Sequence, residues 1–331
     1  MRRGLTGPLA AALLLAACGS GTAAPPSPTP SPPPGSPYAE PSPTSSPQPL
    51  QRFEASLPAP VEETAAASAG GKLYVMGGFN AAGASLNTVF VFDGTRWSSG
   101  PPLPIPVDHA SAATLDDHVY IAGGHSNGAD SARLYRLDGN RWTELARMHY
   151  ARGGHALIAA AGRLYAIGGN TAAANVAPVE EYSPASNAWT VLAPLPQPRN
   201  HVAGFVLGSS VCVAGGRSPN TARVDCFDLS RRAWTRLAGL PAPTSGAGAA
   251  VIGAAVVVAG GEDAGENRMV TQLGFYMSGR WSAGPKMLVP RHGFELALFN
   301  GRAWACGGGG APGLHPVATC TSLGDPATSE G

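Results

Sequence analysis

Short apolar runs that end on two glycines recur along the chain after residue 50. The runs are KLYVMGG (72–78), HVYIAGG (118–124), RLYAIGG (163–169), SVCVAGG (210–216), AVVVAGG (255–261) and RAWACGG (302–308). Their length is typical of β-strands, and turn residues such as Gly, Asn, Asp and Pro separate them from further short runs. No helical stripe of adequate length follows residue 50. The pattern therefore predicts an all-β chain.

The spacing of these runs predicts a repeat array. The glycine pairs recur at a nearly constant interval, and a tryptophan stands at one fixed distance before each pair from the second onward. Each period contains four short strands, as in HALIAAAG, RLYAIGG, APVEEYSP and AWTVLAPLP of the third repeat. Four antiparallel strands repeated radially are typical of a propeller blade.

The order of markers within each period resembles the kelch repeat. An apolar-Tyr-apolar-apolar-Gly-Gly strand is followed by a strand with Tyr or Phe and then by Trp, over about residues 51–324. The resemblance implies a six-bladed kelch-type β-propeller. We expect the recurring Tyr and Trp side chains to pack between blades, and the glycines to serve backbone geometry rather than phosphate binding.

The sixth repeat lacks a tryptophan after Gly307, so its outer strand must come from elsewhere. The interval from Trp to Gly-Gly, counted back from Gly77, reaches Gln51, and Leu57 stands at the offset that separates Trp189 from Leu195. We therefore predict that residues 51–56 form the outer strand of the last blade and close the ring, which leaves no free sheet edge. Phe53 is expected to take the packing role of the missing Trp.

The N-terminal segment predicts export. Residues 1–17 combine Arg2 and Arg3 with an apolar stretch too short to span a bilayer. The sequence LAAC at 15–18 resembles the bacterial lipobox, which implies cleavage before Cys18 and a lipid on its thiol; an ordinary cleaved signal is the alternative. Residues 18–50 predict a disordered Pro/Ser/Thr-rich tether, and 325–331 a disordered tail. We expect an exported monomer, anchored through Cys18 to a bacterial membrane on the cell surface or periplasmic side.

Four cysteines remain after Cys18, and they form two pairs of equal spacing. Each pair places one Cys before a Gly-Gly and one in the next strand, which are antiparallel neighbours. Of the three possible connectivities we favour Cys212–Cys226 and Cys306–Cys320. An exported protein meets the oxidising compartment that these bonds need. Four buried thiols are the alternative.

One face of the ring gathers the polar residues that precede each first strand or follow each Gly-Gly. In kelch propellers this is commonly the binding face, which the resemblance carries over as an expectation. Glu62 and Glu63 reach it from the first repeat, and Asp108 from the second. The candidate ligand-binding residues are Asn80, His109, His125, His155, Asn170, Arg199, His201, Arg217, Glu262, Arg291 and His292.

These observations favour a binding module whose rim meets a glycan, peptide or protein. The alternative is a carbohydrate-active enzyme resembling the bacterial kelch-type sialic-acid epimerase, in which Arg199, Arg291 and Glu262 would act. Net charge is +1, without a basic stripe, which disfavours nucleic acid. No metal or cofactor is expected, because a wide channel should separate the histidines that successive repeats contribute.

Overall fold

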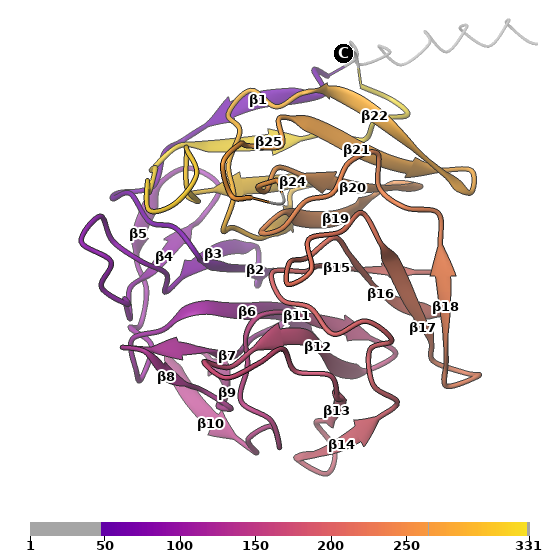
Figure 1. The fold of residues 1–331 in the computed structure, drawn as a ribbon. Helices are drawn as coiled ribbons and strands as arrows, with labels where there is room; N and C mark the ends of the chain where they lie inside the picture. The colour runs from indigo at the N-terminus through magenta and orange to yellow at the C-terminus, as the bar shows by residue number, and fades with distance from the viewer. Residues whose placement is uncertain (1–47, 264, 330–331) are drawn as a thin grey trace, which may run out of the picture. The chain divides into compact units, whose positions relative to one another are not determined.

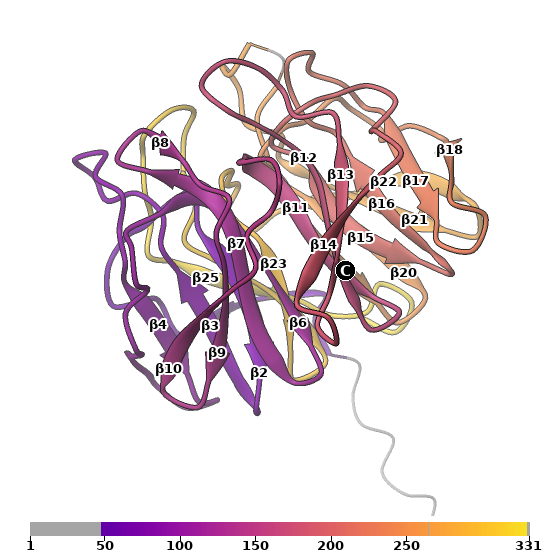
Figure 2. The same cartoon turned by 90° about the horizontal axis from the view of Figure 1, so that it is seen from below.

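The computed structural model describes residues 48–263 and 265–329, and these residues form six β-sheets around one axis (Figure 1). Each sheet is a blade of four antiparallel strands, and the second blade carries one additional short strand. Figure 2 shows the ring after a 90° turn, with connecting loops gathered at its two faces. None of the described residues forms a helix that is long and apolar enough to cross a membrane.

The six blades, numbered I to VI along the chain, have the following strands. Blade I contains β2 (Ala65–Ala69), β3 (Lys72–Met76), β4 (Val89–Phe92) and β5 (Trp97–Ser99); blade II contains β6 (Asp108–Leu115), β7 (His118–Ser126), β8 (Ala129–Asp130), β9 (Leu134–Asp138) and β10 (Arg141–Leu145). Blade III contains β11 (Gly153–Ala160), β12 (Arg163–Asn170), β13 (Val179–Ser183) and β14 (Ala188–Leu192); blade IV contains β15 (Ala203–Leu207), β16 (Ser210–Ala214), β17 (Val224–Asp228) and β18 (Ala233–Leu237). Blade V contains β19 (Gly248–Ile252), β20 (Ala255–Ala259), β21 (Gln272–Met277) and β22 (Arg280–Lys286); blade VI contains β23 (Leu296–Phe299), β24 (Arg302–Cys306), β25 (Cys320–Leu323) and β1 (Gln51–Glu54).

The ring closes as the counting predicted. Strand β1 pairs antiparallel with β25, with Gln51 opposite Leu323 and Glu54 opposite Cys320, so that the first described strand completes the last blade. In Figure 1 the indigo β1 lies beside the yellow β25. The six-bladed kelch-type propeller is therefore confirmed.

The prediction for Phe53 is wrong, because its side chain is 63% exposed. The tryptophans of blades I to IV donate their indole N–H to a carbonyl of the preceding blade, as Trp189 does to Ala146 at 2.8 Å. Gln51 makes the corresponding link with an amide. Its Nε2 donates to the Lys286 carbonyl at 2.8 Å, and its Oε1 accepts from the Leu288 N–H at 3.0 Å. The polar link between blades V and VI is thus kept without an aromatic ring.

Apolar side chains fill the spaces between blades rather than a single central core. Six separate clusters of buried residues lie one at each junction between neighbouring blades. Tyr165 and Ile167 of blade III, for example, pack in one cluster with Val211 and Phe227 of blade IV. The recurring Tyr and Trp belong to these clusters, which is the packing role that we expected of them.

The double glycines allow close approach between neighbouring blades. Gly77 adopts φ +64°, and a Cβ there would lie 2.6 Å from the carbonyl oxygen of Val107, which begins the next blade's segment. A side chain at this position would therefore meet both backbone strain and a steric clash.

Two disulfides join the second and third strands of blades IV and VI. They are Cys212–Cys226 and Cys306–Cys320, and each pair lies directly opposite in the strand register. The alternative of four free thiols is therefore wrong. Structural disulfides point to an extracytoplasmic location. The predicted signal peptide and Cys18 lie outside the described residues, as does the predicted tether up to residue 47.

Candidate functional site

Six equivalent residues, one per blade, stand just before or at the start of the inner strands and encircle the channel mouth. Each stands at the same offset before the double glycine of its blade, and they are Glu63, His109, Gly154, His201, Gly246 and Gly293. Backbone hydrogen bonds link several of them around the axis: the His109 N–H donates to Glu63 O at 3.1 Å, and the Gly246 N–H to His201 O at 2.9 Å. We call this set the axial ring.

All six members of the axial ring have left-handed backbone conformations. The three glycines have φ of +58°, +67° and +60°, which suits a residue without a side chain. Glu63, His109 and His201 adopt the same conformation with φ of +52°, +53° and +53°. Left-handed backbone costs about 1–2 kcal/mol for an ordinary L-residue. These three blades therefore carry a side chain at a position where the fold favours glycine. Backbone strain of this kind concentrates at functional sites.

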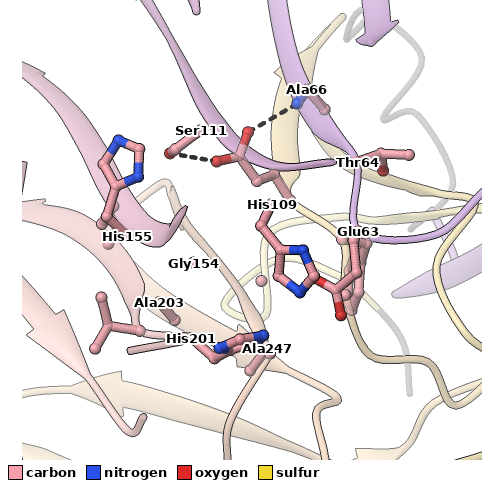
Figure 3. Close-up of a pocket in the computed structure, with 18 of the residues that line it drawn as sticks. Glu63, Thr64, Ala66, His109, Ser111, Gly154, His155, His201, Ala203 and Ala247 are labelled. Carbon is pink, nitrogen blue, oxygen red and sulfur yellow. Dashed lines mark hydrogen bonds and ion pairs between the residues drawn. The ribbon is translucent and has the colours of Figure 1, made fainter. Parts of the chain in front are cut away.

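The three side chains of the axial ring converge on one cavity. The cavity has a volume of about 110 Å³ and is lined by the inner strands of all six blades. His109 Nε2 lies 3.5 Å from Glu63 Oε2, and the rings of His109 and His201 are 4.9 Å apart (Figure 3). The expectation that a wide channel separates the histidines is therefore wrong for His109 and His201. The left-handed turn before each inner strand brings these side chains to the axis.

Neighbouring residues orient both imidazole rings. His109 Nδ1 donates to Asp108 Oδ1 at 2.6 Å, and His201 Nδ1 donates to Asn200 Oδ1 at 2.5 Å. Both acceptors precede their histidine directly in the sequence. Each ring is thus fixed in orientation, with Nδ1 bonded to its neighbour and Nε2 left for other partners.

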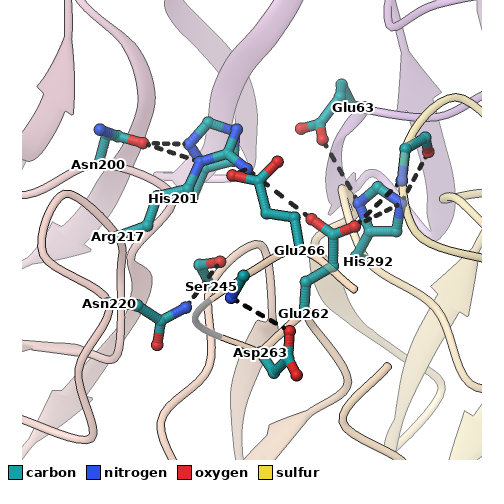
Figure 4. A network of polar contacts seen from close by, with 12 residues as sticks. Glu63, Asn200, His201, Arg217, Asn220, Ser245, Glu262, Asp263, Glu266 and His292 are labelled. Carbon is teal, nitrogen blue, oxygen red and sulfur yellow. Dashed lines mark hydrogen bonds and ion pairs between the residues drawn. The ribbon is translucent and has the colours of Figure 1, made fainter. Parts of the chain in front are cut away.

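A polar network extends from the axial ring to the loops of blades IV to VI (Figure 4). Arg217 Nη2 donates to His201 Nε2 at 2.9 Å, while its Nη1 lies 2.5 Å from Glu266 Oε1 and 3.8 Å from Glu262 Oε2. His292 lies between Glu262 and Glu63. Its Nε2 is 3.7 Å from Glu262 Oε1, and its Nδ1 is 3.7 Å from Glu63 Oε1. We call the residues Glu63, His109, His201, Arg217, Glu262 and His292 the polar mouth.

Burial and charge pairing set the protonation of the polar mouth. Burial alone would raise the pKa of Glu63, but the surrounding histidines outweigh it and hold that pKa well below its usual range. Burial also opposes protonation of His292, yet the nearby glutamates raise its pKa to about 9. Burial holds the pKa of His201 well below its usual range, and it raises the pKa of Glu62 to about 7. At neutral pH the mouth therefore combines an anionic Glu63, a cationic His292 and a neutral His201.

Two of the expected ligand-binding arginines lie in the wrong place for contact with a ligand. Arg199 and Arg291 are fully buried between strands. Arg199 Nε donates to the Gly215 carbonyl at 2.6 Å and Nη1 pairs with Asp225 at 2.9 Å, while Arg291 Nη1 donates to the Gly307 carbonyl. Each guanidinium thus binds the double glycine of its own blade. Neither arginine lines the cavity, and both guanidiniums hold the backbone of the double glycines.

The other predicted residues have mixed surroundings. His125 packs edge-on against His109 at 5.5 Å and pairs with Asp130 at 3.0 Å, so it borders the polar mouth. Asn80 Oδ1 accepts from two backbone N–H groups of its own loop. Asn170 Nδ2 donates to the adjacent Thr171 carbonyl. His155 lines the cavity, and its ring nitrogens have no hydrogen-bond partner among the described residues.

Sequence reasoning missed an acidic residue deeper in the channel. Glu295 accepts hydrogen bonds from Ser111 Oγ at 2.5 Å and from the Ala66 N–H at 2.7 Å (Figure 3). Its signal was a single carboxylate in the otherwise apolar segment GFELALF, directly before β23. Glu266, which holds Arg217, was also missed, because it lies in an irregular loop.

Comparison with known proteins agrees with this architecture. The family model KLHDC2/KLHL20/DRC7 Kelch-repeats domain matches residues 49–216. No curated protein matches the chain significantly. A solved structure titled "Structure of YjhT" is similar with a TM-score of 0.71 and 16% identity, over 83% of this chain and 97% of that chain. At that identity the likeness concerns the fold alone. With just over half of its length matched by the family model, the chain belongs to the KLHDC2/KLHL20/DRC7 Kelch-repeats domain family, whose propellers are scaffolds for binding.

Proposed function

We propose that the chain is an exported binding module whose polar mouth receives an extracytoplasmic protein or peptide partner. The observation that carries this proposal is the convergence of ionisable side chains from five different blades on one end of the channel. Loops positioned by a rigid scaffold commonly carry binding residues. No single blade supplies more than two of these side chains, so packing within one blade does not explain why they lie together.

The scaffold holds the backbone of this face constant while the side chains vary. The residue directly before each axial-ring residue pairs, backbone to backbone, with the residue that follows the Gly-Gly of the same blade. These pairs include Asn200 with Arg217, Ser245 with Glu262 and His292 with Gly309. The same pairing joins Asp108 to His125 and Gly153 to Asn170. Six fixed backbone positions thus present a different side chain each, which is what a recognition surface requires.

Accessibility indicates which groups a partner meets first. The side chain of Arg217 is 24% exposed and that of Glu266 is 50% exposed, whereas Glu262 is 5% exposed. A partner carboxylate can replace Glu266 at the Arg217 guanidinium, because arginine binds carboxylates through two parallel hydrogen bonds. The proposed ligand is therefore an acidic peptide segment, and an anionic glycan would use the same contact.

The test is capture of partners by the full-length chain. Biotinylated wild-type protein is incubated with cell-surface extracts and with arrays of acidic peptides and anionic glycans. Arg217→Ala should reduce capture of the identified partner at least tenfold. Arg96→Ala is the matched control, since Arg96 is 85% exposed in the turn between β4 and β5. Equal capture by both variants would contradict a role for the polar mouth, and capture of glycans alone would replace the peptide.

A lipid anchor on Cys18 would hold this module at a bacterial membrane. Metabolic labelling with a radioactive fatty acid should mark the wild-type chain, whereas Cys18→Ser should leave it unlabelled and release it from the membrane fraction. Labelling that persists in Cys18→Ser would place the lipid elsewhere.

One observation favours a second candidate, a sugar isomerase. Glu63 and His109 form a carboxylate–imidazole pair at 3.5 Å that faces the cavity, and general acid–base chemistry needs such groups within hydrogen-bond reach of a substrate. NMR spectra of sialic acid and hexose anomers would show faster interconversion with wild type than with Glu63→Gln. Identical rates with and without the protein would remove this candidate.

A further inference from the structure

We propose that Glu63, His109 and His201 form a binding site for one divalent transition-metal ion of the zinc type. This inference goes beyond the proposed function, because ion binding needs no protein partner. It is carried by the geometry of the three side chains, by the residues that orient them and by the backbone strain at all three positions.

The three side chains offer suitable ligand atoms at a suitable spacing. One carboxylate oxygen and one nitrogen from each imidazole all lie within 4.8 Å of one another. Two ligands about 2.1 Å from a tetrahedral ion lie roughly 3.4 Å apart. Glu63 Oε2 and His109 Nε2 are already separated by 3.5 Å. Only small rotations of the side chains would therefore bring the set around one ion.

The chemistry of the set selects the class of ion. Two imidazoles and one carboxylate hold zinc in many proteins and leave at least one coordination position open. The same donor set also binds iron(II), whereas Mg²⁺ and Ca²⁺ prefer oxygen ligands. Zn²⁺ and Co²⁺ should therefore bind, and Mg²⁺ and Ca²⁺ should not compete.

The orientation of both histidines matches that of metal ligands. Histidines that bind metals usually donate their second ring N–H to a carboxylate or carbonyl, which fixes the ring. Here Asp108 and Asn200 accept from Nδ1 of His109 and His201, at 2.6 and 2.5 Å. This leaves Nε2 of each ring for the ion.

Backbone strain gives independent support. Among the six members of the axial ring, the three with side chains are the same three that form the ligand set. Blades III, V and VI satisfy the same left-handed conformation with glycine. Packing alone would not require a strained residue at each of these three positions. An ion on the axis, in contrast, requires ligand side chains that project from the axial ring.

Arg217 competes with the ion for His201. Its guanidinium donates to His201 Nε2 at 2.9 Å and is itself held by Glu266 at 2.5 Å. Metal binding must therefore displace this side chain, which has room to move because it is partly exposed. Removing the guanidinium with R217M should strengthen metal binding, by about tenfold.

The experiment measures metal binding by the full-length chain without any partner. Wild type is dialysed against Co²⁺ and Zn²⁺, bound ion is counted by mass spectrometry, and Co²⁺ absorption reports its coordination. We expect one ion per chain, with absorption typical of nitrogen and oxygen ligands. Glu63→Gln, His109→Gly and His201→Gly should each weaken binding at least 100-fold. His118→Ala is the control, since His118 is exposed and its Nδ1 lies 2.8 Å from the Asp116 carbonyl, away from the ligand set.

The glycine variants separate metal binding from folding. Because glycine is already present in three blades, His109→Gly and His201→Gly should keep the circular dichroism spectrum and melting temperature of wild type while losing the ion. No stoichiometric binding by wild type would overturn the proposal. Binding that survives when Glu63→Gln, His109→Gly and His201→Gly are combined in one chain would also overturn it, since the ion would then be adventitious only. If a glycine variant unfolds, the test rests on the other two variants: the proposal requires weaker metal binding by Glu63→Gln and stronger binding by R217M, and it is overturned if neither changes the affinity.

Discussion

Arg152 Nη2 donates to Glu180 Oε2 at 2.8 Å, and both side chains are fully buried within blade III. The same guanidinium donates to the Gly168 carbonyl at 3.0 Å, so it joins the double glycine to the third strand. Arg199 makes the corresponding links in blade IV, with Asp225 and Gly215. A buried ion pair of this kind leaves an uncompensated charge when one partner is removed.

Glu180→Ala should therefore lower the free energy of unfolding by about 3–5 kcal/mol, because Arg152 would remain buried without its counter-charge. Urea denaturation followed by tryptophan fluorescence measures the change. The control is Glu144→Ala, which breaks the partly exposed pair with Arg133 and should cost less than about 1 kcal/mol. Equal losses in the two variants would contradict the importance of burial.

Blade VI lacks this ion pair, which suggests a stabilising change. Arg291 is fully buried, and in place of a carboxylate it contacts Thr319 through the carbonyl at 2.9 Å and through Oγ1 at 3.3 Å. Burial lowers the pKa of Arg291 to about 10. Thr319 stands at the same sequence offset from its arginine as Glu180 does from Arg152. Thr319→Glu should raise the melting temperature by several degrees in a thermal scan, whereas Thr319→Gln should not.

Glu295 should make stability depend on pH. Burial raises the pKa of its carboxyl to about 7, above the 4.5 of an unfolded glutamate, although hydrogen bonds from Ser111 and the backbone oppose the shift. The folded state therefore binds this proton more tightly, and the stability that it provides is lost as pH rises from about 4.5 to 7. The loss is about 3 kcal/mol. Denaturant unfolding of wild type and Glu295→Gln across this range should show a flatter profile for the variant, and parallel profiles would contradict the assignment.

The disulfide in blade IV should contribute to stability by restricting the unfolded chain. Closing a loop of about 15 residues contributes roughly 3 kcal/mol. Replacing Cys212 and Cys226 together with alanine should therefore lower the free energy of unfolding by about 2–4 kcal/mol. Reducing the wild type in denaturant breaks both disulfides and should therefore give a larger loss than the double variant. A double variant as stable as wild type would show that strand pairing alone holds these residues together.

Most of the fold could be predicted from the sequence, because the intervals between the recurring Trp and Gly-Gly residues define the blades. The constant interval from Trp to Gly-Gly located β1, although no aromatic marks Gln51. The substitute for the aromatic could not be predicted, since an amide at Gln51 meets the same backbone requirement as an indole. Phe53 was the wrong choice because a two-residue shift along β1 takes the side chain past the blade interface and into solvent.

The candidate site could be predicted only in part, for a different physical reason. The sequence predicted one face for the residues before each inner strand, but their directions depend on a left-handed backbone turn that the sequence does not signal at His109 or His201. Arg199 and His201 are two residues apart, yet one is buried against Gly215 and the other faces the axis. Alternation along a regular strand would have given both the same direction.

The antiparallel pairing of β1 with β25, which closes the ring, determines how the ring responds to force. Tension applied through the residues that precede Gln51 would act first on β1, which pairs with β25 from the other end of the described residues. That load passes to β25, where Cys320 stands opposite Glu54 and is covalently bonded to Cys306 on β24. Blade VI thus has a cross-link directly behind the strand that would be pulled, so β24 and β25 would stay joined when β1 peels away.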